Sequence, residues 1–242
     1  MSDWQAKIHP QKLPRHVGII MDGNGRWAAL RHLPRNFGHR AGMKTLKEIV
    51  ICCSELGIET LTVFAFSTEN WKRPLTEVNF LMGLLAEYIE RELSELKRKN
   101  VKISILGDLD HIPSRIQNEI DRAVSETASN QGLVLNIAFN YGARQEIVQA
   151  IQAIAAKVAA GEIRAEEINE QMVNEYLFTK GLPDPDLIIR PSGELRLSNF
   201  LLWQSAYTEF WFDRVLWPDF SRQDFCRAIV EFQQRHRRFG GL

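Results

Sequence analysis

The sequence predicts an α/β fold with a central, mostly parallel six-stranded sheet flanked by helices. Short apolar runs alternate along the chain with longer segments whose apolar residues recur at helical spacing. Polar and glycine-containing turns also follow three of the apolar runs. The carboxyl ends of parallel strands meet at one edge of a sheet, where open α/β sheets bind their ligands. We therefore expect the functional chemistry at that edge.

The strands and helices follow from this alternation. We expect strands at residues 17–21, 59–66, 102–107, 133–139 and 186–190, followed by short apolar runs at 200–203 and 207–212. Helices are expected to begin near Arg26 and to cover residues 38–57, 76–99, 113–127, 144–160, 165–177 and 221–237. Residues 31–36, with Pro34 and several cations, predict a loop.

Length and charge limit the possible classes of protein. The 242 residues, 45% of them hydrophobic, suit one domain over residues 1–242, with an N-terminal arm at 1–15 and a C-terminal tail at 235–242. Thirty basic residues balance thirty acidic ones, so no overall field would attract nucleic acid. We expect no nucleic-acid partner, and any basic site must be local.

The cysteines and the N-terminus indicate a cytoplasmic protein. Cys52, Cys53 and Cys226 match no metal-binding spacing and are expected to be reduced thiols in the core. The first residues lack a signal-peptide run, and no stretch approaches 18 uninterrupted apolar residues. We expect a cytoplasmic location, at most peripheral to the inner face of the membrane.

The stretch HVGIIMDGNGRW at residues 16–27 reads as a buried strand, a turn and the start of a helix. Asp22 or Asn24 could simply cap that helix. Alternatively, the free N–H groups of the helix, the glycines and Arg26 could bind an anion. The stretch is neither a Walker A loop nor a dinucleotide fingerprint. A bare anion would repel Asp22, so the second interpretation requires a divalent cation between them.

Three expected strand ends carry complementary groups, in the segments DGNGRW, STENWKR and RPSGELRLS. Together with the helix start near residue 38 they supply many cations and few acids: Arg26, Arg35, His39, Arg73, Arg190 and Arg196, with Ser67 and Ser198. Guanidinium groups and hydroxyls suit diphosphate oxygens, and so many cations indicate more than one diphosphate. Mg²⁺ would then be expected, with Asp22 as a protein ligand and Glu209 as a possible second one.

The expected helix at 76–99 carries one apolar stripe: Leu81, Leu84, Leu85, Tyr88, Ile89, Leu93 and Leu96. A stripe of this kind usually packs into a core. Beside a diphosphate site it could also form the wall of an apolar cavity.

Four segments resemble signatures of one family: HVGIIMDGNGRWA, GHRAG, FSTENWKRP and RPSGELRLSNFLLWQSAYTEF. Together they are similar to the cis-prenyltransferases of the undecaprenyl diphosphate synthase family, over residues 16–241. The resemblance implies repeated condensation of isopentenyl diphosphate with an allylic diphosphate such as farnesyl diphosphate, each new double bond being cis. The implied product is a long-chain polyprenyl diphosphate, here undecaprenyl diphosphate, the lipid-carrier precursor for cell-wall polysaccharides.

The resemblance also implies roles for residues of this chain. Asp22 and Asn70 would be catalytic, and Asp22 and Glu209 would hold Mg²⁺. Substrate would be bound by three groups of residues: Gly23, Asn24, Gly25, Arg26, Trp27, Arg35 and His39 on the allylic diphosphate; Arg190, Arg196, Leu197 and Ser198 on isopentenyl diphosphate; and Ser67, Thr68, Glu69, Trp71 and Arg73 at their junction. A neutral amide is a poor base, so Asn70 is interpreted as a positioning group that relays the proton. Leu195 departs from the polar residue, often His, of many relatives.

Growth of the product requires an apolar tunnel between the sheet and the helix stripe. Candidate walls are Leu81, Leu84, Leu85, Tyr88, Ala65, Leu133 and Phe139. Each buried five-carbon unit contributes about 4 kcal/mol, so product release is expected to be slow and to be helped by transient contact with a membrane. The family further implies a homodimer in which Arg238-Phe239-Gly240 reaches the partner's site.

Three rival interpretations explain fewer of these residues. A non-catalytic member of the same fold would not need the full set of charged and polar site residues. A generic phosphate-binding protein or phosphotransferase would not need a large apolar helix face, and the Walker lysine is absent. A trans-prenyl synthase would carry DDxxD motifs, which this sequence lacks.

Overall fold

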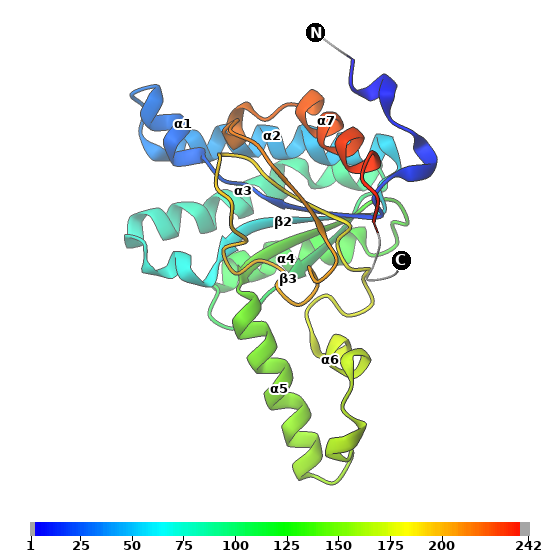
Figure 1. The fold of residues 1–242 in the computed structure, drawn as a ribbon. Helices are drawn as coiled ribbons and strands as arrows, with labels where there is room; N and C mark the ends of the chain where they lie inside the picture. The colour runs from blue at the N-terminus through cyan, green and yellow to red at the C-terminus, as the bar shows by residue number, and fades with distance from the viewer. Residues whose placement is uncertain (1–2, 238–242) are drawn as a thin grey trace.

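The structure is a computed structural model that describes residues 3–237. Six strands form one sheet in the order β3-β4-β2-β1-β5-β6, and every pairing is parallel. This confirms the predicted α/β class. Figure 1 shows helices on both sides of the sheet, with α5 and α6 projecting away from it.

The elements alternate along the chain as the sequence predicts. The strands are β1 His16–Ile20, β2 Thr60–Ser67, β3 Lys102–Leu106, β4 Val134–Tyr141, β5 Leu187–Arg190 and β6 Glu209–Phe212. The helices are α1 Asn24–Leu30, α2 Arg35–Leu56, α3 Leu75–Arg98, α4 Ser114–Thr127, α5 Ala143–Ala159, α6 Glu170–Tyr176 and α7 Arg222–Gln233. Short 3₁₀ turns precede β1, follow β2 at Thr68–Lys72 and precede α6 and α7.

The strand order places a switch point beside β1. Strand β1 pairs with β2 on one side and with β5 on the other, so the chain crosses from one half of the sheet to the other between β4 and β5. Ligands of open α/β sheets bind at the carboxyl ends of the strands where the order reverses. Asp22 follows β1 and Arg190 ends β5, so both side chains start from this point.

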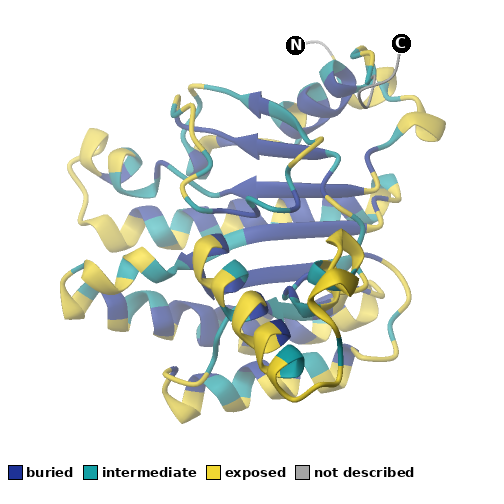
Figure 2. Ribbon diagram, turned by 60° about the horizontal axis from the view of Figure 1, so that its bottom comes forward, coloured by how far each residue is buried: buried dark blue, intermediate teal, exposed yellow. Residues whose placement is uncertain are grey.

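A large core lies between the sheet and the layer of α2, α3, α4 and α7, and a smaller core covers the opposite face around Tyr141 and Phe200. Figure 2 shows the strands buried along most of their length. Cys52, Cys53 and Cys226 are buried free thiols in the large core, as predicted.

Several expected boundaries were wrong. Residues 35 and 36 belong to α2, because Pro34 is its N-cap residue and ends the loop. The expected helix at 165–177 is a 3₁₀ turn followed by α6, whose N-cap Asn169 accepts a hydrogen bond from the Met172 N–H. The run at 200–203 is a turn rather than a strand, and α7 ends at Gln233.

Helices α1 and α2 approach each other closely at two glycines of α2, Gly38 and Gly42. A Cβ atom on Gly38 would lie 1.9 Å from the carbonyl oxygen of Asn24, and one on Gly42 would lie 2.4 Å from the Asn24 Oδ1. The absence of side chains at these two positions lets α2 hold the first turn of α1 in place.

No helix within residues 3–237 combines the length and apolarity that crossing a membrane requires.

Candidate active site

A cavity of about 610 Å³ opens at the carboxyl edge of the sheet and extends between the sheet and helices α2 and α3. Ten of the predicted site residues line it: Asp22, Asn24, His39, Ser67, Glu69, Asn70, Arg73, Arg190, Arg196 and Ser198. The predicted tunnel walls Ala65, Phe139, Leu81, Leu84, Leu85 and Tyr88 also line it, joined by Ile137 and Met43. Leu133 is buried in the core but does not line the cavity, so that prediction was wrong. The space is therefore polar at one end and apolar at the other.

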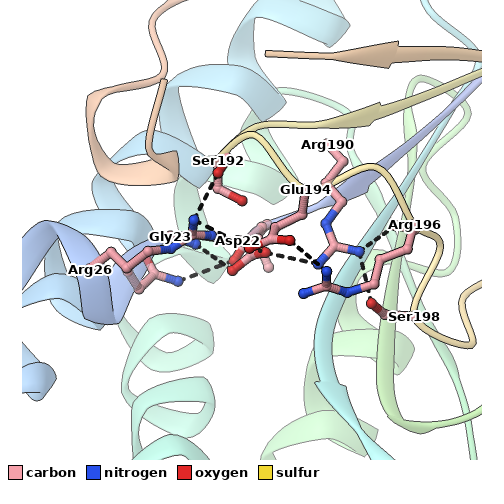
Figure 3. Close-up of polar contacts among 10 residues, drawn as sticks. Asp22, Gly23, Arg26, Arg190, Ser192, Glu194, Arg196 and Ser198 are labelled. Carbon is pink, nitrogen blue, oxygen red and sulfur yellow. Dashed lines mark hydrogen bonds and ion pairs between the residues drawn. The ribbon is translucent and has the colours of Figure 1, made fainter. Parts of the chain in front are cut away.

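Asp22 lies at the centre of the polar end (Figure 3). Its Oδ2 is 2.8 Å from Nη2 of Arg190 and 3.4 Å from Nη2 of Arg26, and its Oδ1 accepts the Gly23 N–H at 2.7 Å. Gly23 has φ of 106°, which favours glycine at this turn. Burial alone would raise the pKa of the Asp22 carboxyl, but the hydrogen bond and charge of Arg190 and the Gly23 N–H lower it below the ordinary value. Asp22 is thus held as a carboxylate.

Arg190 joins the two sides of this polar end. Arg190 is only 4% exposed. Its Nη1 donates to Ser198 Oγ at 2.8 Å and to the carbonyl oxygen of Arg196. Ser192, Ser198 and Asn199 all have positive φ, a conformation that costs energy for residues other than glycine. The loop after β5 therefore holds a strained shape that brings Arg196 and Ser198 towards Arg190.

Arg26 and Arg196 share a second acid. The Arg26 Nη1 is 3.4 Å from Glu194 Oε1 and donates to the carbonyl oxygen of Ser192 at 2.8 Å, while Arg196 pairs with Glu194 Oε2 (Figure 3). Glu194 has no role among the residues that the sequence predicts for the site. Its position between two basic residues of the motif was the signal that could have found it.

A second cluster, of two arginines and a neutral histidine, surrounds Glu77 at the start of α3. Its Oε1 is 2.7 Å from Nη1 of Arg73, 3.2 Å from Nε of Arg35 and 3.9 Å from Nε2 of His39. Burial lowers the pKa of His39 to about 4. The charges of Arg35 and Arg73 also lower this pKa, whereas the charge of Glu77 raises it. The structure thus confirms that these three predicted residues lie together. The sequence pattern did not single out Glu77, although an acid four residues after Arg73 at the start of the expected helix was a signal for this pair.

Asn70 belongs to the 3₁₀ turn after β2. Its Oδ1 accepts the Ser67 N–H at 3.1 Å, which leaves its amide N–H groups for other partners. Beside it, Glu69 accepts a hydrogen bond from the Asn199 Nδ2 at 2.8 Å, which ties this turn to the loop after β5. The turn and the loop therefore position each other across the mouth of the cavity.

Several predicted residues lie away from the cavity lining: Gly23, Gly25, Arg26, Trp27, Arg35, Thr68, Trp71, Leu197 and Glu209. Arg26 and Arg35 still belong to the two charged clusters described above, and a Cβ atom on Gly25 would contact Arg35. By contrast, the Trp27 Nε1 donates to Asp219 at 2.6 Å and the Trp71 Nε1 donates to Asn140 at 2.7 Å. The exposed Leu195 and the half-buried Leu197 also lie outside the lining.

Glu209 is not brought to Asp22. It begins β6, beside the first residue of β5, whereas Asp22 lies beyond the last residue of β1. Its Oε2 accepts a hydrogen bond from Arg235 at 2.8 Å. Within one copy of the described chain, the two carboxylates therefore belong to opposite edges of the sheet. The predicted segment Arg238-Phe239-Gly240 lies outside the described residues.

The residues present fit one mode of Mg²⁺ binding. No cluster of three or more His, Cys, Asp and Glu side chains suited to a metal occurs in the described part of the chain. Mg²⁺ is commonly held by one or two carboxylates together with substrate phosphates. The ionised, half-buried Asp22 between Arg26 and Arg190 offers one such carboxylate where phosphates would lie.

Comparisons with known proteins agree with this fold and site. The model of the undecaprenyl diphosphate synthase family matches residues 20–240. The chain is 53% identical over 236 residues to an isoprenyl transferase of Heliobacterium mobile, covering 98% of this chain and 91% of that one. It is 55% identical over 231 residues to an isoprenyl transferase of Clostridium perfringens, covering 96% and 91%. The chain belongs to the undecaprenyl diphosphate synthase family of cis-prenyltransferases and is a prenyltransferase.

Solved structures of relatives share the fold. Lavandulyl diphosphate synthase from Lavandula x intermedia, in complex with dimethylallyl diphosphate, is 38% identical with a TM-score of 0.93, covering 95% of this chain and 99% of that one. A probable undecaprenyl diphosphate synthase from Campylobacter jejuni is 35% identical with a TM-score of 0.77, covering 94% and 98%.

Proposed function

We propose that this prenyltransferase condenses isopentenyl diphosphate repeatedly with farnesyl diphosphate and produces undecaprenyl diphosphate, the lipid-carrier precursor for cell-wall polysaccharides. One observation carries the proposal: two separate cation clusters meet at the mouth of a cavity whose inner walls are apolar. Two diphosphates need two such clusters, and a growing hydrocarbon chain needs the apolar space.

The geometry suggests how the residues divide the work. Arg35, His39 and Arg73 would bind the allylic diphosphate together with the first turn of α1, and Arg190, Arg196 and Ser198 would bind isopentenyl diphosphate. Asp22 lies between Arg26 and Arg190 and would hold Mg²⁺, which supplies positive charge to the departing diphosphate. Asn70 keeps its amide N–H groups for substrate, which suits positioning rather than proton removal.

The proposed assembly is a homodimer with a cytoplasmic location that contacts the membrane transiently when product leaves. Val148 and Ile151 on α5 are 50% and 57% exposed, and α5 projects from the sheet beside α6 (Figures 1 and 2). Exposed apolar side chains on a projecting helix favour contact with a second copy. In a dimer, a partner could also bring Glu209 or the C-terminal tail near another site.

The test is incubation of the pure chain with farnesyl diphosphate, labelled isopentenyl diphosphate and Mg²⁺, followed by sizing of the extracted product. A labelled C55 product is expected, and chelation of Mg²⁺ should abolish it. Asp22→Asn should lower turnover at least about 100-fold, because a preorganised charge at the reacting diphosphate is lost. The matched control is Asp121→Asn on the exposed face of α4, which should keep full activity.

Failure to form any labelled long-chain product, with and without detergent, would overturn the proposed reaction. Full activity of Asp22→Asn would overturn the metal assignment alone. A product of a different length would keep the reaction class but reject undecaprenyl diphosphate.

A further inference from the structure

A second groove, of about 410 Å³, lies between α2 and α3, beside the main cavity. Aromatic, aliphatic and basic side chains share its lining: Trp27, Phe37, Arg40, Ala41, Met43, Lys44, Leu84, Glu87, Tyr88 and Arg91. Such a mixture suits an amphiphile that carries negative charge.

The charge of the groove is positive. Arg40 pairs with Glu87, the only acid in the lining, at 2.6 Å between Nη1 and Oε1. Lys44 has no ion pair within residues 3–237, and Arg91 contacts Glu92, which also pairs with Lys47. The whole chain has a formal net charge of zero, so this surplus is local. Exposed cations of this kind favour an anionic surface.

Apolar side chains extend the groove towards α1. Leu30 is 71% exposed, Leu33 is 38% exposed and Phe37, which lines the groove, is 50% exposed. They lie along the end of α1, the connection to α2 and the first turn of α2. Figure 1 shows α1 and the first turns of α3 at the same edge of the molecule. Exposed apolar residues beside cations are typical of proteins that bind the membrane interface.

One layer of side chains separates this groove from the main cavity. Met43, Leu84 and Tyr88 line both spaces. Tyr88 is only 2% exposed, and its hydroxyl has no hydrogen-bond partner within the described residues. The Tyr88 hydroxyl thus adds a polar group to a wall whose other shared members, Met43 and Leu84, are apolar.

We propose that the edge formed by Leu30, Leu33, Phe37, Lys44 and Arg91 is a docking surface for a bilayer of anionic phospholipid. Lys44 and Arg91 contact the headgroups, and the three apolar side chains enter the interface between headgroups and acyl chains. Docking here places lipid one side-chain layer from the cavity. The further conclusion that product leaves through this wall rests on the function proposed above.

Co-sedimentation with vesicles tests the surface without any substrate. The pure chain should bind vesicles that contain phosphatidylglycerol and should bind vesicles of phosphatidylcholine alone weakly. The double variant Lys44→Glu, Arg91→Glu should lose roughly 25-fold or more in affinity, because each basic residue near an anionic surface contributes about fivefold. Leu33→Ser combined with Phe37→Ser should also weaken binding.

The matched control is Lys102→Glu with Arg115→Glu, which makes the same change of charge at exposed positions of β3 and α4. It should bind like the unmodified chain. Equal loss in both double variants would show that only net charge matters and would overturn the proposed surface. Calorimetric binding of inorganic phosphate to Lys44 and Arg91, without binding of vesicles, would assign the groove to a free anion instead and would also overturn it.

Activity in detergent separates this proposal from the proposed function. The Lys44→Glu, Arg91→Glu variant should keep its activity in detergent and lose the stimulation that phosphatidylglycerol vesicles give. Vesicle binding by a chain that forms no polyprenyl product would reject the function and keep the docking surface. Normal product formation without vesicle binding would reject the docking surface and keep the function.

Discussion

At the residue scale, the site is defined by acids that hold its cations in place. Asp22 contacts Arg26 and Arg190, and Glu77 contacts Arg35 and Arg73. Cations gathered for an anionic substrate would otherwise repel one another. A carboxylate among them keeps the guanidinium groups in position before the diphosphate arrives.

Two buried histidines predict how stability depends on pH. Burial lowers the pKa values of His16 and His39 to about 4, while both would titrate near 6.5 in the unfolded chain. Between these values the unfolded chain binds more protons, so the free energy of unfolding should fall as the pH drops from 6.5 to 4. Each histidine can account for about 3 kcal/mol over this window.

Urea unfolding at pH 7 and at pH 4.5 measures this effect. His16→Gln should flatten the pH dependence relative to the unmodified chain, and His32→Gln at an exposed position is the matched control. Burial raises the pKa of Glu146 and acts in the opposite direction, so the comparison between variants is the informative quantity. Equal pH dependence in His16→Gln and the unmodified chain would contradict the assignment.

At the element scale, the contact between α1 and α2 fixes the mouth of the cavity. Gly38→Ala would place a Cβ atom 1.9 Å from the Asn24 carbonyl oxygen, so one helix must move. We expect a loss of about 1–3 kcal/mol in the free energy of unfolding and a higher KM for the allylic diphosphate. Denaturant unfolding and steady-state kinetics measure these two results.

Gly83→Ala provides the matched control, because a Cβ atom at Gly83 in α3 would contact nothing within 4 Å. Alanine there should stabilise the chain by about 0.5–1 kcal/mol and leave KM unchanged. Similar effects of the two substitutions would show that the close approach at Gly38 has no special role.

At the scale of the whole molecule, the strand order decides where the chemistry lies. Residues 168 positions apart, Asp22 and Arg190, meet because β1 and β5 are neighbours at the switch point. Helix α5 follows β4 at this edge of the sheet, and α5 and α6 project away from the sheet (Figure 1).

The proposed dimer makes a prediction about this projection. Val148→Glu with Ile151→Glu should convert the dimer into a monomer, because two charges would be buried at a contact between copies. Size-exclusion chromatography with light scattering measures the mass. Ser114→Glu with Asn118→Glu on α4 adds the same charge at exposed positions and should leave the dimer intact. A monomeric unmodified chain would contradict the prediction.

The local sequence pattern was sufficient to predict the fold class of this protein and much of its site. The alternation of apolar runs and helical stripes predicted the α/β class, and the polar turns after three strands predicted that Asp22, Asn70 and Arg190 line one cavity. The boundaries at residues 35, 169 and 233 were missed because capping decides them within one turn. Trp27 and Trp71 belong to the right motifs, but their indoles bond to Asp219 and Asn140, which are distant in sequence.

The sequence by itself determined the class of fold, the family and the chemical character of the site, because residue types and their spacing along strands and helices are local properties. Only the tertiary structure decided which charges meet. It placed Glu77 between Arg35 and Arg73, Glu194 between Arg26 and Arg196, and Glu209 at the far edge of the sheet from Asp22. Those pairings depend on strand order and helix packing, which join segments that no local pattern connects.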